Sequence, residues 1–315
     1  MKFGREYMRY IKMIAALMTG AAMFTVAAQA TAESFEGKAS GITVDYEIDL
    51  PEGYENSDKT YPVIYVLHSW GRTHNTQFKC TVTERCDDNN GSAKKFMQEA
   101  VAAGKMEPSI LVYPNGMKSS FFADSFDGKK PIETSIISDL IPHVDTTYRT
   151  KPGRANRAVM GLRLGGYGAA LYGLKHPDKF AAAVSVAGAL HDWYTCIHPD
   201  EKMPSCMTDM FNGNYSYYLD SSPWHHAATN TAAIKNYGIG IRLTMGDDDE
   251  LKMRAETLGK HLTTLGIPYE FEQVLACTAG KGPNRPGRNF NCIQEKSEVS
   301  AFEYIGTQMK KANEM

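Results

Sequence analysis

The 315-residue sequence has little excess of either charge and no run of basic residues. Its 34 Lys and Arg residues nearly balance its 36 Asp and Glu residues, so the formal net charge is −2. Proteins that bind nucleic acid carry a basic patch for the phosphates, and we therefore expect no nucleic-acid partner. The hydrophobic fraction of 43% and the charged fraction of 22% exclude a chain that is largely disordered.

Internal repeats, low-complexity tracts and a linker between two halves are also missing from the sequence. Repeats would indicate a solenoid, and a polar linker would indicate two separately folding units. We therefore expect one domain that covers residues 31–315. No feature of the sequence indicates an oligomeric state.

The sequence has one long apolar run, residues 13–28, and it is short for a membrane-spanning helix. Four basic residues precede the run, and the small-residue pattern Ala-Gln-Ala ends it at residues 28–30. This order is typical of a secretory signal peptide, with an uncleaved anchor as the alternative. We expect residues 1–30 to be the signal and the mature protein to be secreted or periplasmic, without a membrane segment.

The cysteines lack the spacing of a metal site, because none of them form a C-x-x-C motif and no histidine lies at ligand spacing from them. We therefore expect no metal and no other cofactor. Six cysteines permit several connectivities, but in an oxidising compartment pairing between sequence neighbours is the simplest arrangement. The expected disulfides are Cys80 with Cys86, Cys196 with Cys206, and Cys277 with Cys292.

Short β-branched runs alternate along the chain with longer segments of helical periodicity. Residues 61–68 and 157–161 are almost wholly apolar, as in central parallel strands covered on both faces. This alternation predicts an α/β fold with a mostly parallel central sheet and helices on both faces. Strands are predicted at 42–50, 61–68, 109–113, 157–161, 181–186, 238–245 and 269–275, and helices at 93–103, 135–148, 165–175, 251–265 and 296–311.

Two long turn-rich segments, residues 72–92 and 191–224, each hold a pair of cysteines. We expect both to lie as irregular excursions over the carboxyl edge of the sheet, where open α/β folds bind ligands.

Residues 161–165 read Gly-Leu-Arg-Leu-Gly between a predicted strand and a predicted helix. This is the framework of the nucleophile elbow G-x-S-x-G, in which two glycines allow a sharp strand-to-helix turn. The central residue, which should be Ser, is Arg163, and a guanidinium has no lone pair with which to attack a carbonyl. An elbow would hold Arg163 at positive φ, at a cost of about 1–3 kcal/mol. A plain glycine-rich turn is the alternative.

The sequence around this turn resembles the secreted branch of the esterase-D-like family. That family contains S-formylglutathione hydrolases, feruloyl and acetylxylan esterases and secreted mycolyltransferases. The resemblance implies an α/β-hydrolase fold and carboxylic-ester chemistry by a Ser, an Asp and a His in that chain order. It is carried by residues 61–71 (Tyr-Pro-Val-Ile-Tyr-Val-Leu-His-Ser-Trp-Gly), 137–149, 176–180 (His-Pro-Asp-Lys-Phe), 222–226 (Ser-Pro-Trp-His-His), 245–250 (Met-Gly-Asp-Asp-Asp-Glu) and 265–271.

The resemblance places the triad acid at Asp249, in the turn after a predicted strand, with Asp248 as an equally reachable carboxylate. The triad histidine should follow the last strand, but residues 276–292 contain none. His261 is the one histidine that follows Asp249 in the sequence, and it lies in a predicted helix. Without a nucleophile no bond to the acyl carbon can form, and without a base no group takes up and returns the proton. We therefore expect a catalytically inactive pseudo-hydrolase.

The oxyanion-type donors would be the backbone N–H groups of Leu164 and of Ser69 or Trp70. An active hydrolase or acyltransferase with a relocated constellation is therefore an alternative. It would use Ser69 with a histidine such as His68 as a base within about 3 Å.

Arg163 leaves two further alternatives open. A permanent cation at a helix N-terminus could hold a small-molecule, carbohydrate-linked or acylated anionic ligand. The same cation could instead pair with Asp249 or Asp248 and plug the cleft, which would indicate a structural or interaction protein.

Overall fold

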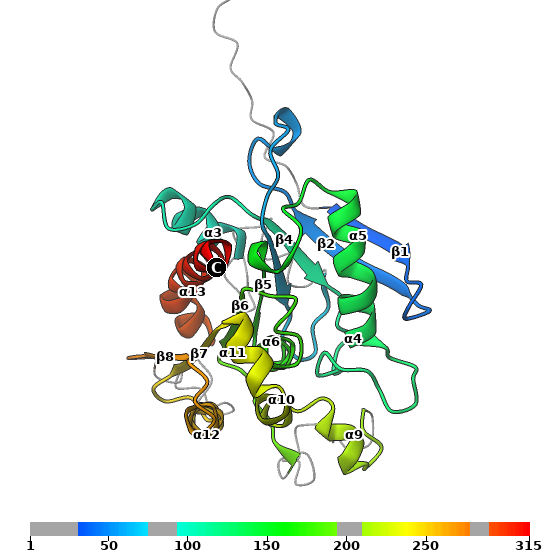
Figure 1. Ribbon diagram of the computed structural model, residues 1–315, viewed down its shortest axis with the longest axis vertical. Coiled ribbons are helices and arrows are strands. Elements are labelled where there is room, and N and C mark those ends of the chain that lie inside the picture. The colour runs from blue at the N-terminus through cyan, green and yellow to red at the C-terminus, as the bar shows by residue number, and fades with distance from the viewer. Residues whose placement is uncertain (1–30, 75–92, 194–209, 278–289) are drawn as a thin grey trace, which may run out of the picture.

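The computed structural model describes residues 31–74, 93–193, 210–277 and 290–315. Within these residues eight strands form one sheet in the order β1-β2-β4-β3-β5-β6-β7-β8, shown in Figure 1. The pairings β1·β2 and β2·β4 are antiparallel and the other five are parallel. The strands are β1 (Thr31–Glu36), β2 (Thr43–Asp49), β3 (Val63–Leu67), β4 (Ile110–Pro114), β5 (Arg157–Leu162), β6 (Ala182–Val186), β7 (Gly240–Gly246) and β8 (Glu270–Val274).

The central strands follow the predicted pattern closely. Every residue of β3, β4, β5 and β6 is buried, because helices cover both faces of a parallel sheet. Strand β1 was not predicted: it is the edge strand, it is hydrogen-bonded to β2 alone among the described strands, and its residues are almost all exposed. A strand with so little buried surface leaves no hydrophobic period in the sequence.

Helices cover both faces of this sheet, as predicted. In Figure 1, α3 (Ala93–Ala102) and α13 (Phe290–Glu314) lie together on one face. The segment from α4 (Ile132–Thr134) to α5 (Ile141–Thr147) and helix α6 (Leu164–Lys175) lie on the other face. The remaining elements are η1 (Tyr54–Asn56), η2 (Ser135–Leu140), η3 (Arg154–Asn156), α9 (Tyr215–Leu219), α10 (Pro223–Thr229), α11 (Thr231–Tyr237) and α12 (Lys252–Thr264).

Three predictions about the helices need correction. The helix expected at 135–148 begins at Ile132 and contains the π-helical stretch η2. The last helix begins at Phe290 rather than at residue 296, because its first turns contain few periodic apolar residues. The segment 191–224 was expected to be irregular, but its described part holds α9 and the start of α10, whose caps Asn214 and Ser222 accept backbone N–H bonds.

Several expectations fall on residues outside the described ranges: the signal peptide at 1–30, most of the excursion 72–92, and Cys80, Cys86, Cys196 and Cys206. Among the helices that are described, none combines the length and the apolar character that a membrane span needs.

Candidate functional site

The turn between β5 and α6 has the geometry of a nucleophile elbow. Arg163 lies between the two elements at φ 55° and ψ −109°, a backbone conformation that costs a residue with a Cβ about 1–3 kcal/mol. A Cβ at Gly165 would lie 2.0 Å from the carbonyl oxygen of Leu67, and one at Gly161 would lie 2.4 Å from the backbone of Gly165. Both glycines are therefore required by close backbone contacts, as the motif predicted.

The backbone of Arg163 is held from both sides of this turn. Its N–H donates to the carbonyl oxygen of Val186 at 3.1 Å. Its carbonyl oxygen accepts from the N–H groups of Tyr167 at 3.1 Å and Ala189 at 2.8 Å. Three backbone hydrogen bonds compensate the strain of the positive φ and fix the direction in which the side chain leaves the turn.

The Arg163 side chain forms a bidentate ion pair with Asp249. Nη1 donates to Oδ1 at 3.0 Å and Nη2 donates to Oδ2 at 2.7 Å. The two side chains are only 6% and 1% exposed. This fork-to-fork geometry is the strongest arrangement available to an arginine and a carboxylate. The internal pair that the sequence left open is thus present.

The choice between the two candidate acids is decided by the turn that follows β7. The Oδ1 atom of Asp249 also accepts the N–H of Leu251 at 2.9 Å, which points the carboxylate inward. Asp248, the alternative, is exposed. Asp247 turns the other way and accepts the N–H of Ala276 at 3.0 Å, and hydrogen bonds from backbone N–H groups lower the pKa of Asp247.

The expected oxyanion loop lies against the elbow. Leu164 is the first residue of α6, so its N–H has no acceptor within the helix. The loop after β3 closes as a turn in which Arg72 N–H donates to the carbonyl oxygen of Ser69 at 3.2 Å. Ser69 is half-buried and Trp70 is 45% exposed.

His68 is buried and both of its ring nitrogens are engaged by backbone groups. Nδ1 lies 3.0 Å from the carbonyl oxygen of Ser69, and Nε2 lies 2.9 Å from the N–H of Gly116. A carbonyl can only accept and an N–H can only donate, so the proton is on Nδ1 and the Nε2 lone pair is occupied. Burial lowers the pKa of His68 to about 4, and the ring is neutral at physiological pH.

Where the family pattern expects a catalytic histidine, the chain after β8 is tied to α13. The Nζ atom of Lys296 donates to the carbonyl oxygens of Leu275 at 2.9 Å and Ala276 at 3.3 Å. Cys277 and Cys292 form a disulfide with a sequence separation of 15, which confirms one of the three expected pairs. His261 lies in α12, as expected, and its Nε2 bonds to the carbonyl oxygen of Trp224 at 3.1 Å.

Replacing Cys277 and Cys292 together by serine is expected to lower the free energy of unfolding by about 3 kcal/mol, because the bond closes a loop of 15 residues. Urea unfolding of the double variant and of the wild type under oxidising conditions measures the difference. A matched Ser297→Ala variant on the same helix controls for substitutions in α13. A loss below about 1 kcal/mol would contradict a stabilising role for this bond.

Sequence reasoning missed a second pairing of side chains in this region. His191 is buried, and its Nδ1 accepts from Nη1 of Arg254 at 2.5 Å. The proton of this imidazole is therefore on Nε2. The two residues are 63 positions apart, in a turn-rich segment and in a predicted helix, and no local pattern connects them.

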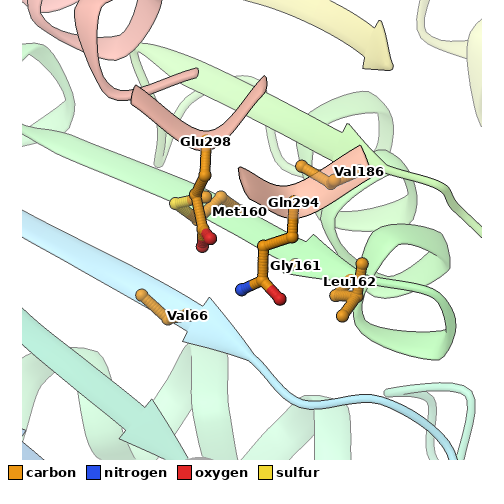
Figure 2. A pocket seen from close by; sticks show the side chains of 7 residues that line it. All are labelled: Val66, Met160, Gly161, Leu162, Val186, Gln294 and Glu298. Carbon is orange, nitrogen blue, oxygen red and sulfur yellow. The ribbon is translucent and has the colours of Figure 1, made fainter. Parts of the chain in front are cut away.

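A void of about 10 Å³ lies under the elbow, on the face covered by α13, and has room for one water molecule. Figure 2 shows Gln294 and Glu298 of α13 pointing into it from one side, above β3 and β5. Glu298 is 4% exposed, and its burial raises its pKa to about 8. The void is lined by Val66, Met160, Gly161, Leu162, Val186, Gln294 and Glu298, and not by Arg163 or Asp249.

Across the described ranges, His, Cys, Asp and Glu side chains do not gather in threes in any arrangement that could ligate a metal ion.

Comparisons with known proteins point in one direction. A family model described as "Putative esterase" matches residues 38–280, more than three quarters of the chain. An esterase of Mycobacterium tuberculosis is 32% identical over 158 residues, which are 49% of this chain and 31% of that protein. An endo-1,4-beta-xylanase/feruloyl esterase of Xylanibacter ruminicola is 30% identical over 154 residues, which are 47% of this chain and 20% of that protein. The chain spans less than a third of the length of these curated relatives.

Solved structures give the same fold. A ferulic acid esterase superposes with a TM-score of 0.67 at 21% sequence identity, over 89% of this chain and 98% of that chain. An S-formylglutathione hydrolase from Staphylococcus aureus superposes with a TM-score of 0.66 at 17% identity, over 88% of this chain and 98% of that chain. These neighbours confirm the predicted α/β-hydrolase fold.

Proposed function

Because this chain belongs to the esterase family whose model spans most of it, we propose that it is a non-hydrolysing member of that family. Its former catalytic cleft is closed by an ion pair, and its role is structural or interactive rather than catalytic. The observation that carries the proposal is the buried bidentate contact between Arg163 and Asp249. It joins the position of the nucleophile directly to the position of the triad acid.

The site lacks a nucleophile and a free triad acid, and both features support inactivity. The guanidinium of Arg163 cannot attack an acyl carbon, and Asp249 is bonded to that guanidinium instead of orienting an imidazole. In a well-studied serine protease, removing the nucleophile or the histidine lowers kcat about 10⁶-fold. The backbone donors at Leu164 and Ser69 could still polarise a carbonyl. The rate enhancement that such donors give without a nucleophile and a base is only about 10³–10⁴-fold over water.

The geometry of His68 argues against a relocated constellation. A general base for Ser69 would need a free nitrogen lone pair within about 3 Å of the hydroxyl. The Nδ1 atom of His68 carries a proton toward a carbonyl, and its Nε2 accepts from Gly116. The active-hydrolase alternative therefore has no support from this histidine.

A second candidate function is binding of a carbohydrate-linked or acylated anionic ligand. One curated relative is named an endo-1,4-beta-xylanase/feruloyl esterase, a name that joins a carbohydrate-directed activity to an ester-directed one. A carboxylate ligand that reached Arg163 would have to displace Asp249 from a site that is almost fully buried. Ligand binding at Arg163 would thus require an opening of the cleft.

We also propose that the protein acts outside the cytoplasm. The order of residues 1–30 matches a secretory signal, and the disulfide between Cys277 and Cys292 is typical of an oxidising compartment.

The test is turnover of short-chain aryl esters and of methyl ferulate by the purified mature protein. We expect at most the weak rate that the backbone donors alone could give, about 10³–10⁴-fold over water. The Arg163→Ser variant should be no faster, because a serine without a base stays protonated. Mass spectrometry after incubation with a fluorophosphonate should find no adduct.

A saturable rate in the wild type that Ser69→Ala abolishes and Ser34→Ala preserves would overturn the proposal. Ser34 is the matched control because it lies exposed on the edge strand β1. An acyl adduct on any side chain of the wild type would overturn it as well.

A further inference from the structure

A groove of about 390 Å³ lies at the edge of the sheet away from the elbow. Its lining includes Gly240, the first residue of β7, and Glu270, the first residue of β8. Arg163 instead follows the carboxyl end of β5, which is parallel to these strands. The groove is therefore separate from the closed cleft, and residues of helices α11 and α13 line it.

Two lysines from different helices line this groove. Lys235 extends from α11, and its ammonium lies 3.1 Å from the position that a Cβ would take at Gly266. Lys311 extends from the last turns of α13. Within the described ranges neither ammonium has a carboxylate within salt-bridge distance, whereas Lys94, Lys151 and Lys175 all do.

Among the residues that line the groove, Glu270 is the one carboxylate. Its Oε1 lies 3.4 Å from Nε of the buried Arg242, whose Nη2 lies 2.7 Å from Oε2 of Glu272, so Arg242 compensates Glu270 only in part. The two lysines still outnumber this carboxylate in the lining, and the resulting net positive charge favours an anionic occupant.

Aromatic rings complete the walls. Tyr269 and Tyr304 are half-buried and line the groove. The hydroxyl of Tyr304 donates to the carbonyl oxygen of Ile241 at 3.1 Å, which fixes the ring in place. The two rings offer apolar surface to a flat or ring-shaped ligand. The side-chain amide of Gln308 adds a donor and an acceptor.

We propose that this groove binds a small ring-bearing carboxylate, with the ring against the tyrosines and the carboxylate between Lys235 and Lys311. The volume falls within the range of small-molecule sites. The site does not depend on the closed cleft, because no residue of the Arg163–Asp249 pair lines it.

Isothermal titration of the full mature chain with benzoate and with glucuronate tests this site, with benzyl alcohol and glucose as the uncharged comparisons. We expect one or both carboxylates to bind, and the stronger of the two identifies the kind of ring. Lys235→Gln and Lys311→Gln should each weaken that binding about fivefold, since each removes one close charge contact. The double variant should show no measurable binding.

Lys310→Gln is the matched control, because it removes the same charge from the same helix at a position that does not line the groove. It should bind like the wild type. Absence of binding by both carboxylates at tens of millimolar would overturn the proposal. So would equal losses in Lys310→Gln and Lys311→Gln, or equal affinity for the charged and uncharged probes.

Discussion

Replacing Arg163 by methionine is expected to lower the free energy of unfolding by about 3–5 kcal/mol at neutral pH. Asp249 would remain buried at 1% side-chain exposure with one backbone hydrogen bond, from Leu251, and no cation. Methionine keeps a Cβ and a chain of similar length, so the strain of the positive φ and much of the packing are unchanged. The loss of unfolding free energy therefore measures the cost of leaving the buried Asp249 carboxylate without a cation.

The reciprocal variant and the double variant complete the test. Asp249→Leu alone leaves a buried guanidinium and should cost a similar amount. Arg163→Met with Asp249→Leu removes both charges, and its stability should return to within about 1 kcal/mol of the wild type or exceed it. The coupling between the two sites then follows from the double-mutant cycle.

Chemical unfolding of the four proteins measures this cycle, with Lys179→Met as the control at an exposed pair with Asp178. An exposed ion pair contributes little, so the control should change far less than Arg163→Met. Additive losses in the double variant would contradict the conclusion that the two side chains form one buried unit.

The retention of a strained turn without a nucleophile follows from packing. Gly165 lies directly against the carbonyl oxygen of Leu67, and the carbonyl oxygen of Arg163 accepts two backbone N–H groups. Opening the turn would break these hydrogen bonds and separate α6 from β3. The elbow is thus part of the joint between helix and sheet, and it persists whether or not its central residue can react.

The fold and the elbow could be predicted from the sequence because both leave local patterns. A buried parallel strand is an apolar run, and a turn that brings two backbones together needs glycines at set positions. The partner of Arg163 left no such pattern. Three successive aspartates follow β7, and only the turn decides that Asp247 points to Ala276 while Asp249 points inward.

The roles of the histidines were also beyond the sequence. His68 stands in the expected oxyanion loop, where a base would be useful, but its nitrogens are engaged by the backbone of Ser69 and of Gly116, the latter 48 residues away. His191 gains its partner Arg254 from helix α12, 63 residues later in the chain. Contacts of this kind depend on the assembled structure, which a linear pattern does not encode.

Glu298 is expected to make the stability of the protein fall with rising pH. Its pKa is about 8 in the folded chain against an ordinary value of 4.5, because burial disfavours the charged form. Between these two values the unfolded chain has lost the proton while the folded chain retains it. The contribution of this group to the free energy of unfolding is therefore fully present below about pH 4.5, declines as the pH rises, and is lost above about pH 8. The difference amounts to roughly 5 kcal/mol.

Glu298→Gln removes this dependence, because an amide is uncharged at every pH and has nearly the shape of a protonated carboxyl. Near pH 5 the variant should match the wild type, and near pH 9 it should be more stable by several kcal/mol. Glu295→Gln is the matched control: it lies on the same helix but is exposed, so its unfolding curves should parallel those of the wild type. Urea unfolding across this pH range measures all three proteins. If the difference between Glu298→Gln and the wild type stayed constant from pH 5 to pH 9, Glu298 would not be the buried neutral acid that its place under the elbow implies.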